Sequence, residues 1–209
     1  MASKWVYLID PGHGGIVDGR YVTPGKRSPK FPDGHVLYEG VNNRAITTKI
    51  IAKLKEYGFE ALDIVSSQED ISLKKRIDKA NALHLNKKCV YISIHSDACG
   101  NGLEWNEAKG ISIYTSIGQS KSDVFASLVI DSMEEVMGDS VKWRKDLSDK
   151  DEDKEENFYV LKNTNCPAIL CELGFHTNMD EANRIQTDEW HTKVVAAIVI
   201  AVQKWEKIL

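Results

Sequence analysis

Four side chains suited to metal binding or proton transfer stand where apolar segments of the sequence end or where a helical segment begins. The run "VYLIDPGH" ends at His13, "CVYISIH" ends at His95 and "PAILCE" ends at Glu172, while Glu39 precedes a helical pattern. Two histidines and one carboxylate, with a fourth position left to water, form a common catalytic zinc site. A second carboxylate nearby can accept the proton that such a water loses. These residues therefore predict a zinc-dependent hydrolytic site, with one glutamate as ligand and the other as general base.

Taken one at a time, the same residues have structural explanations. A histidine at the end of a strand commonly satisfies a backbone group, and an acid in the first turn of a helix, such as Glu39, is favoured by the helix macrodipole. Glu172 is harder to explain in this way, because a carboxylate that closes a buried strand is costly unless it is paired or used. His176, in "GFHTN" shortly after Glu172, is a further candidate for lining the site. The remaining histidines are expected on the surface: His35, His84 and His191.

The elements that must position these residues alternate along the chain. Continuous apolar runs predict strands at 5–9, 59–65, 89–94, 110–115 and 167–173, and helical periodicity predicts helices at 41–58, 72–86, 121–138 and 187–209. Continuously apolar strands are typical of a parallel sheet that is covered by helices on both faces. We therefore expect one α/β domain over residues 1–209, built on a mostly parallel, twisted sheet. In such sheets ligands bind beyond the carboxyl ends of the strands, and this edge would collect all four residues.

Two segments lack any such pattern. Residues 14–38 contain several prolines and glycines and form a long loop between the segments that carry His13 and Glu39. Long loops in compact domains are typically functional or disordered. Residues 144–157, "RKDLSDKDEDKEEN", are a charged run whose simplest interpretation is a solvated surface loop.

The composition is that of an ordinary globular protein, with 209 residues of which 42% are hydrophobic and 28% charged. A net charge of −4 argues against nucleic acid as the main partner, because nucleic-acid-binding proteins usually carry a basic surplus. The N-terminus "MASKWVYLID" shows no signal peptide, and no apolar stretch reaches the length of about 18 residues that a span needs. We therefore expect synthesis in the cytoplasm, unless a leader has been removed, and no membrane span. Cys89 and Cys171 lie in apolar runs and are expected to be buried free thiols.

Several stretches together resemble a known family. They are "IDPGHGG", "YEGVNNRA", "DISLKKRIDKAN", "YISIHSDA", "GISIY" and "VLKNTNCPAILCELGFHTNMDEANRI", in this order over residues 8 to about 185. This set resembles the zinc-dependent N-acetylmuramoyl-L-alanine amidases of the amidase-3 family. The resemblance implies a sheet of about six strands, one zinc ion per chain held by His13, Glu39 and His95, and Glu172 as the catalytic carboxylate. It also implies action at the cell wall on peptidoglycan, at the amide that joins the lactyl group of muramic acid to L-alanine.

Residues around this constellation are expected to support it. Asp10 is placed to orient the His13 ring, as carboxylates commonly do for histidine ligands. Asp97 stands where the family usually shows asparagine, and we expect it to change the hydrogen bonding around His95. The long loop carries three basic residues that are candidates for contacting carboxylates of the stem peptide: Lys26, Arg27 and Lys30.

Two other functions remain open on sequence alone. A zinc peptidase that cuts within the stem peptide would use the same metal chemistry, and a peptidoglycan-binding protein could use an inactive amidase scaffold. The presence of all four site residues argues against the inactive scaffold. A phage or prophage endolysin and a secreted autolysin fit the sequence equally well.

Overall fold

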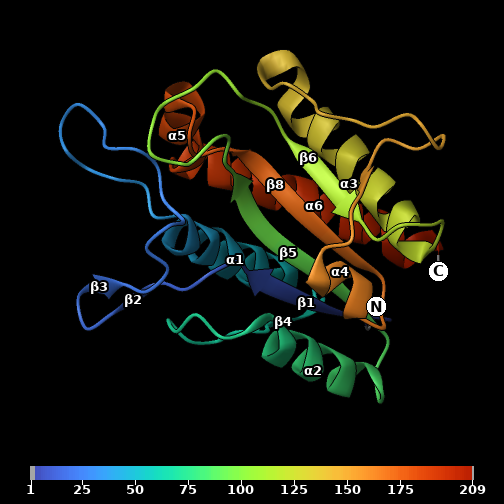
Figure 1. Cartoon of the computed structure of the whole chain (residues 1–209). Helices are drawn as coiled ribbons and strands as arrows, with labels where there is room; N and C mark the ends of the chain where they lie inside the picture. The colour runs from blue at the N-terminus through green and yellow to red at the C-terminus, as the bar shows by residue number, and fades with distance from the viewer. Residues whose placement is uncertain (1–2, 209) are drawn as a thin grey trace.

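The computed structural model describes residues 3–208, which form a six-stranded sheet between two helical layers (Figure 1). Its strands are β1 (Val6–Pro11), β4 (Glu60–Asp63), β5 (Cys89–Asp97), β6 (Ser112–Thr115), β7 (Lys154–Glu155) and β8 (Ala168–Phe175). The strand order is β4-β1-β5-β8-β6-β7, and every neighbouring pair is parallel except β8 and β6. The predicted mostly parallel α/β sheet is therefore confirmed, with β6 and β7 running antiparallel to the other four strands.

Each face of the sheet packs against helices through its own hydrophobic core. One face is covered by α1 (Glu39–Glu56), α3 (Lys121–Met137), α5 (Met179–Ile185) and α6 (Asp188–Ile208), and the other by α2 (Leu73–His84) and α4 (Tyr159–Asn163). Successive residues of β1 alternate between the two cores, with Tyr7 and Ile9 in the first and Val6 and Leu8 in the second. Because both faces are buried, the central strands are apolar at successive positions, which explains their continuous apolar pattern in the sequence.

Short elements inside the loops do not follow from the sequence pattern. A hairpin of β2 (Ile16–Val17) and β3 (Arg20–Tyr21) lies within residues 14–38, a short 3-10 helix follows α3 at Gly138–Ser140, and β7 lies within residues 144–157. Strands of two residues are too short to show any periodicity. The expectation of a solvated loop over 144–157 is wrong at Asp153, which is 1% exposed, because the pairing of β7 with β6 draws this segment against the domain.

The three histidines expected on the surface differ in burial. His35 is exposed and His84 is half-buried, but His191 is only 4% exposed. The ring Nε2 of His191 lies 3.0 Å from Asn42 Oδ1 and 3.1 Å from the Ile185 carbonyl oxygen. The surface prediction for His191 is therefore wrong, because α6 packs against α1 and closes over this ring.

Two further expectations concern the state of the cysteines and the presence of membrane-spanning helices. All four cysteines are free, with Cys89, Cys166 and Cys171 buried and Cys99 exposed, which confirms the buried thiols predicted for Cys89 and Cys171. Between residues 3 and 208, no helix is both long enough and apolar enough to cross a bilayer.

Candidate metal centre and active site

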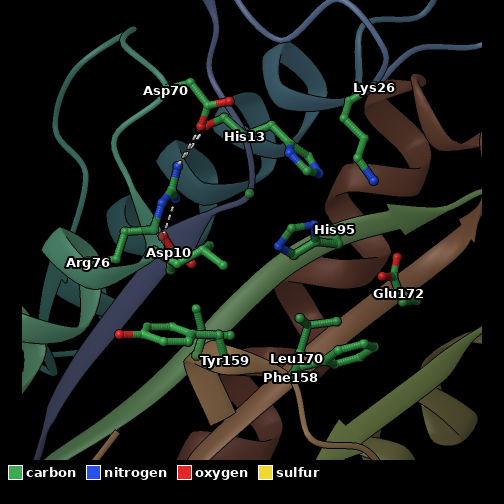
Figure 2. A pocket seen from close by; sticks show the side chains of 13 residues that line it. Asp10, His13, Lys26, Asp70, Arg76, His95, Phe158, Tyr159, Leu170 and Glu172 are labelled. Atoms are coloured by element: carbon green, nitrogen blue, oxygen red, sulfur yellow. Dashed lines mark hydrogen bonds and ion pairs between the residues drawn. The ribbon is translucent and has the colours of Figure 1, made fainter. Parts of the chain in front are cut away.

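The four predicted site residues meet at one edge of the sheet. His13 follows β1, His95 and Glu172 lie near the carboxyl ends of the adjacent strands β5 and β8, and Glu39 is the first residue of α1. Figure 2 shows the rings of His13 and His95 close together, with Glu172 beside them on β8. His13 Nε2 lies 3.2 Å and His95 Nδ1 lies 3.1 Å from the same oxygen, Glu39 Oε1. The three ligand atoms lie within 4.8 Å of one another, a spacing at which one metal ion can contact all three.

The turn after β1 presents His13 to this point. The Gly12 N–H donates to the Ile94 carbonyl at 3.0 Å, so β1 stays bonded to β5 up to the turn. His13 then adopts a φ of 65°, which costs energy for a residue with a side chain unless the surroundings hold it. Arg44 and Arg76 supply that restraint, because each donates a hydrogen bond to the His13 carbonyl oxygen, at 2.9 Å and 3.0 Å.

Two glycines allow the segments that carry the candidate ligands to approach one another. A Cβ atom at Gly12 would lie 2.1 Å from His95 Cε1, far inside van der Waals contact. A Cβ atom at Gly40 would lie 1.8 Å from the Gly14 carbonyl oxygen, so this glycine lets α1 begin directly against the turn. The glycines of the two motifs therefore serve close packing of the ligand-bearing segments.

The carboxylate of Asp10 binds Arg76 and Ser93 rather than the His13 ring. Asp10 Oδ1 lies 2.5 Å from Arg76 Nη1, and Oδ2 accepts the Ser93 hydroxyl at 2.8 Å. Arg76 also donates to the Pro11 carbonyl at 2.7 Å. The expectation that Asp10 orients the imidazole directly is therefore corrected: Asp10 fixes Arg76, and Arg76 fixes the backbone of the turn. Sequence reasoning missed Arg76, which lies 66 positions from Asp10 and whose only signal was its place in a stretch resembling the family.

Glu39 is buried with both histidines directed at it. Burial alone would raise the pKa of the Glu39 carboxyl, but the hydrogen bonds and charges of His13 and His95 outweigh it and hold this pKa well below its usual range. Burial lowers the pKa of His95, and the neighbouring Glu39 carboxylate more than compensates, so the net shift is upward. The second oxygen, Glu39 Oε2, is buried and has no hydrogen-bond partner within residues 3–208. An ionised carboxylate with an unused oxygen beside two imidazoles fits the donor set of a zinc site.

Glu172 lies beside this centre on the neighbouring strand. It is in register with His95 across the β5–β8 ladder, which brings both side chains to the same face of the sheet. Burial raises the pKa of the Glu172 carboxyl to about 8, against the opposing charge of His95 and with a further contribution from Glu39. Glu172 Oε2 finds no hydrogen-bond partner in the described part of the chain. The geometry therefore supplies a carboxylate that is free to exchange a proton next to the candidate metal centre.

A cavity of about 310 Å³ opens over these residues (Figure 2). His13, His95 and Glu172 line it together with Lys26, whose amine is directed into the cavity from the long loop. The Lys26 carbonyl accepts the Glu39 N–H at 3.0 Å, which fixes the lysine beside the centre. An apolar wall that the sequence did not reveal completes the cavity: Leu73, Phe158, Tyr159, Val160 and Leu170.

The other predicted residues lie around this cavity. Arg27 and Lys30 are exposed, and neither lines the cavity described above. The backbone of Arg27 pairs with that of Tyr38 in an isolated antiparallel β-bridge. His176 is buried beside the candidate ligand Glu39, with Nδ1 3.0 Å from the Ser96 hydroxyl and 3.9 Å from Glu39 Oε2. Asp97 follows a shift of register after His95 and accepts the Ala98 N–H at 2.7 Å. Its effect on the hydrogen bonding of His95 stays a prediction.

Comparison with curated proteins finds relatives in bacteria and in a phage. YqiI, an uncharacterised protein of Bacillus subtilis, is 28% identical over 98% of this chain and 86% of its own. The probable cell wall amidase LytH of Staphylococcus saprophyticus is 27% identical over 92% of this chain, which spans only 55% of that relative. The endolysin of Bacillus phage SPP1 is 27% identical over 94% of this chain and 66% of its own.

Comparison with solved structures and with family models agrees with the geometry. The N-acetylmuramoyl-L-alanine amidase from Clostridium difficile 630 matches with a TM-score of 0.79 and 27% identity, over 99% of both chains. A family model described as N-acetylmuramoyl-L-alanine amidase matches residues 8–204. Because this match covers nearly the whole sequence, including every residue of the candidate centre, the chain belongs to the N-acetylmuramoyl-L-alanine amidase family.

Proposed function

We propose that this protein hydrolyses the amide between the lactyl group of N-acetylmuramic acid and the L-alanine of peptidoglycan stem peptides, using one zinc ion held by His13, Glu39 and His95. The observation that carries the proposal is the convergence of three ligand atoms on one point, with the unpaired Glu172 on the next strand. Two histidines and a carboxylate form a typical ligand set for catalytic zinc. Zinc bound there supplies Lewis acidity and makes water acidic enough to lose a proton near neutral pH.

Glu172 transfers the proton in this proposal. Its carboxylate accepts a proton from the attacking water and donates it to the nitrogen of the leaving L-alanine as the C–N bond breaks. The free Oε2 atom has no competing donor among residues 3–208, and the register of Glu172 with His95 places this carboxylate beside the candidate metal ligands. Arg76 and Asp10 take no part in the proton transfer. They fix the backbone turn that presents His13.

The cavity provides contacts for the substrate. Lys26 offers a cation beside Glu172, and a carboxylate of the stem peptide is its natural partner. In the apolar wall, the rings of Phe158 and Tyr159 offer flat surfaces for the rest of the substrate. Arg27 and Lys30 would meet the substrate only farther from the centre. His176 supports the back of the site through Ser96.

The place of action follows from the substrate. Peptidoglycan lies outside the cytoplasm, and relatives named as a probable cell wall amidase and a phage endolysin are consistent with work at the wall. These relatives are compatible with two biological roles for this chain, a bacterial autolysin and a phage endolysin.

Digestion of purified peptidoglycan tests the bond that is cut. Mass spectrometry of the products should show free lactyl carboxyl groups on the glycan and stem peptides that begin with L-alanine. A chelator should abolish release, and added zinc should restore it. Cleavage inside the stem peptide would instead show a zinc peptidase, and no products with the zinc-loaded protein would show an inactive scaffold.

Two variants test the roles of the site residues. Glu172→Gln should keep zinc but lose turnover by about 10²-fold or more, on the order of 3 kcal/mol in the barrier, because the amide cannot accept the proton. The exposed Glu156, changed to Gln, is the matched control and should keep the wild-type rate. A double change of His13 and His95 to Ala should remove zinc, and full zinc occupancy in that variant would refute the ligand assignment.

A further inference from the structure

A second acidic cluster lies away from the candidate active site, where β6 ends. Asp123 stands in the first turn of α3, and Asp151 and Asp153 precede β7. One carboxylate oxygen from each lies within 4.8 Å of the others. Asp123 is 4% and Asp153 is 1% exposed, so two of the three carboxylates are inside the domain. Burying neighbouring carboxylates is costly unless something compensates their charge.

Hydrogen-bond donors in the cluster are too few for its acceptors. The Thr115 hydroxyl lies 2.6 Å from Asp153 Oδ2, 3.3 Å from Asp123 Oδ1 and 3.4 Å from the Ser116 carbonyl oxygen. A hydroxyl carries one hydrogen and can satisfy only one of these acceptors well. Asp151 Oδ1 and Asp153 Oδ1 are buried and have no hydrogen-bond partner within the described residues.

The oxygens that are satisfied hold the cluster in place. The Ser120 N–H donates to Asp123 Oδ2 at 2.5 Å in a capping box at the start of α3. The Gln119 amide donates to Asp151 Oδ2 at 2.8 Å. These bonds leave Asp151 Oδ1 and Asp153 Oδ1 without a partner within the described residues, while Asp123 Oδ1 has only the shared Thr115 hydroxyl.

Among the described residues, positive charge does not compensate this cluster but does compensate a second acidic group nearby. Within residues 3–208, no lysine, arginine or histidine forms an ion pair with Asp123, Asp151 or Asp153. Glu134 and Glu152, in the other acidic group, share the Lys145 amine at 2.6 Å and 2.8 Å. Burial, together with the charges of Asp151 and Asp123, raises the pKa of Asp153 to about 7.

We propose that Asp123, Asp151 and Asp153 bind a hard divalent cation of the Ca²⁺ and Mg²⁺ class, with the Thr115 hydroxyl at the same point. Every available ligand atom is an oxygen, and carboxylate and carbonyl oxygens suit these ions, whereas the histidines of the candidate active site suit zinc. The cation supplies the positive charge that the unpartnered oxygens lack. It also joins the end of β6 and the start of α3 to the segment that leads through β7 to Phe158 and Tyr159 in the cavity wall.

Calcium and magnesium binding to the zinc-loaded protein tests this site. The protein is prepared with stoichiometric zinc in buffer free of other divalent ions, and CaCl₂ or MgCl₂ is titrated into it by calorimetry and in thermal unfolding. We expect saturable binding of one ion and a rise in Tm that grows with its concentration. Loss of a residue that only supports a metal ligand typically costs roughly 10- to 100-fold in metal affinity. Asp153→Asn alters a proposed ligand itself and should therefore weaken cation binding by more than this.

Matched variants separate this site from general charge effects. Asp151 is less buried than Asp153, so Asp151→Asn is the alternative variant if Asp153→Asn fails to fold. Asp151→Asn should cause the same loss of cation binding. Asp131→Asn, in the group that Lys145 neutralises, should bind as the wild type does. If neither ion binds to the wild type at millimolar concentration, the acids share a proton and the proposal is overturned. If binding persists in the Asp151 and Asp153 variants, the ion lies elsewhere and the proposal is equally overturned.

Discussion

Replacing Arg76 with methionine removes the charge that neutralises the buried Asp10 while leaving a side chain of similar length. Both members of this ion pair are 2% exposed, and their closest atoms lie 2.5 Å apart. Removing one partner of a buried pair costs about 3–5 kcal/mol, because the other charge stays buried without compensation. Domains are stable by roughly 5–15 kcal/mol, so this is a large part of the total. At about 2–4 °C per kcal/mol for a chain of this size, Tm should fall by roughly 6–20 °C.

Urea unfolding followed by circular dichroism measures the loss directly. The double variant Asp10→Asn with Arg76→Met is the control, because asparagine keeps a partner for Ser93 but carries no charge. It should be more stable than Arg76→Met alone. A loss of less than about 1 kcal/mol in Arg76→Met, or a double variant no more stable than the single one, would refute the reasoning.

The same substitution should also weaken zinc binding. Arg76 holds the Pro11 and His13 carbonyl oxygens, and through them the turn that presents the ligand ring. Loss of such a partner typically costs about 10- to 100-fold in metal affinity. Competition with a chromophoric chelator measures this, and unchanged zinc affinity in a folded Arg76→Met variant would show that the turn holds His13 without it.

Three further substitutions test the site and the fold. Gly12→Ala should displace His95 and lower zinc occupancy, because the new Cβ would lie 2.1 Å from the ring, whereas Gly25→Ala, with nothing within 4 Å, should have no effect in the same metal analysis. Lys26→Ala should raise KM for peptide-bearing substrate and flatten its salt dependence while kcat changes little, and unchanged KM would show that this charge does not bind substrate. Burial, and then the Lys49 charge, lower the pKa of His191 below 6.5, so the unfolded chain takes up the proton first and stability falls as pH drops below about 6.5. His191→Gln should lessen this fall in denaturation at pH 7 and pH 5, and an identical fall would place the acid sensitivity elsewhere.

The sequence by itself determined the main strands of the sheet and the edge at which the candidate site residues meet. The apolar runs before His13, His95 and Glu172 predicted buried parallel strands, and the carboxyl ends of such strands meet at one edge. Glu39 was predicted at the same edge because it begins the helix that follows the long loop after His13. These inferences hold because strand identity, strand end and side-chain type are all local properties of the chain.

Tertiary structure alone decided which neighbours complete the site. Of the three residues in the long loop that were predicted to contact the stem peptide, only Lys26 lines the cavity, because its carbonyl is bonded to the N–H of Glu39. Arg76 reaches Asp10 across 66 positions of sequence. Asp153 is buried by a strand of two residues whose pairing no periodicity reveals. Each of these contacts joins segments far apart in the chain, and their geometry depends on packing and register, which local composition does not encode.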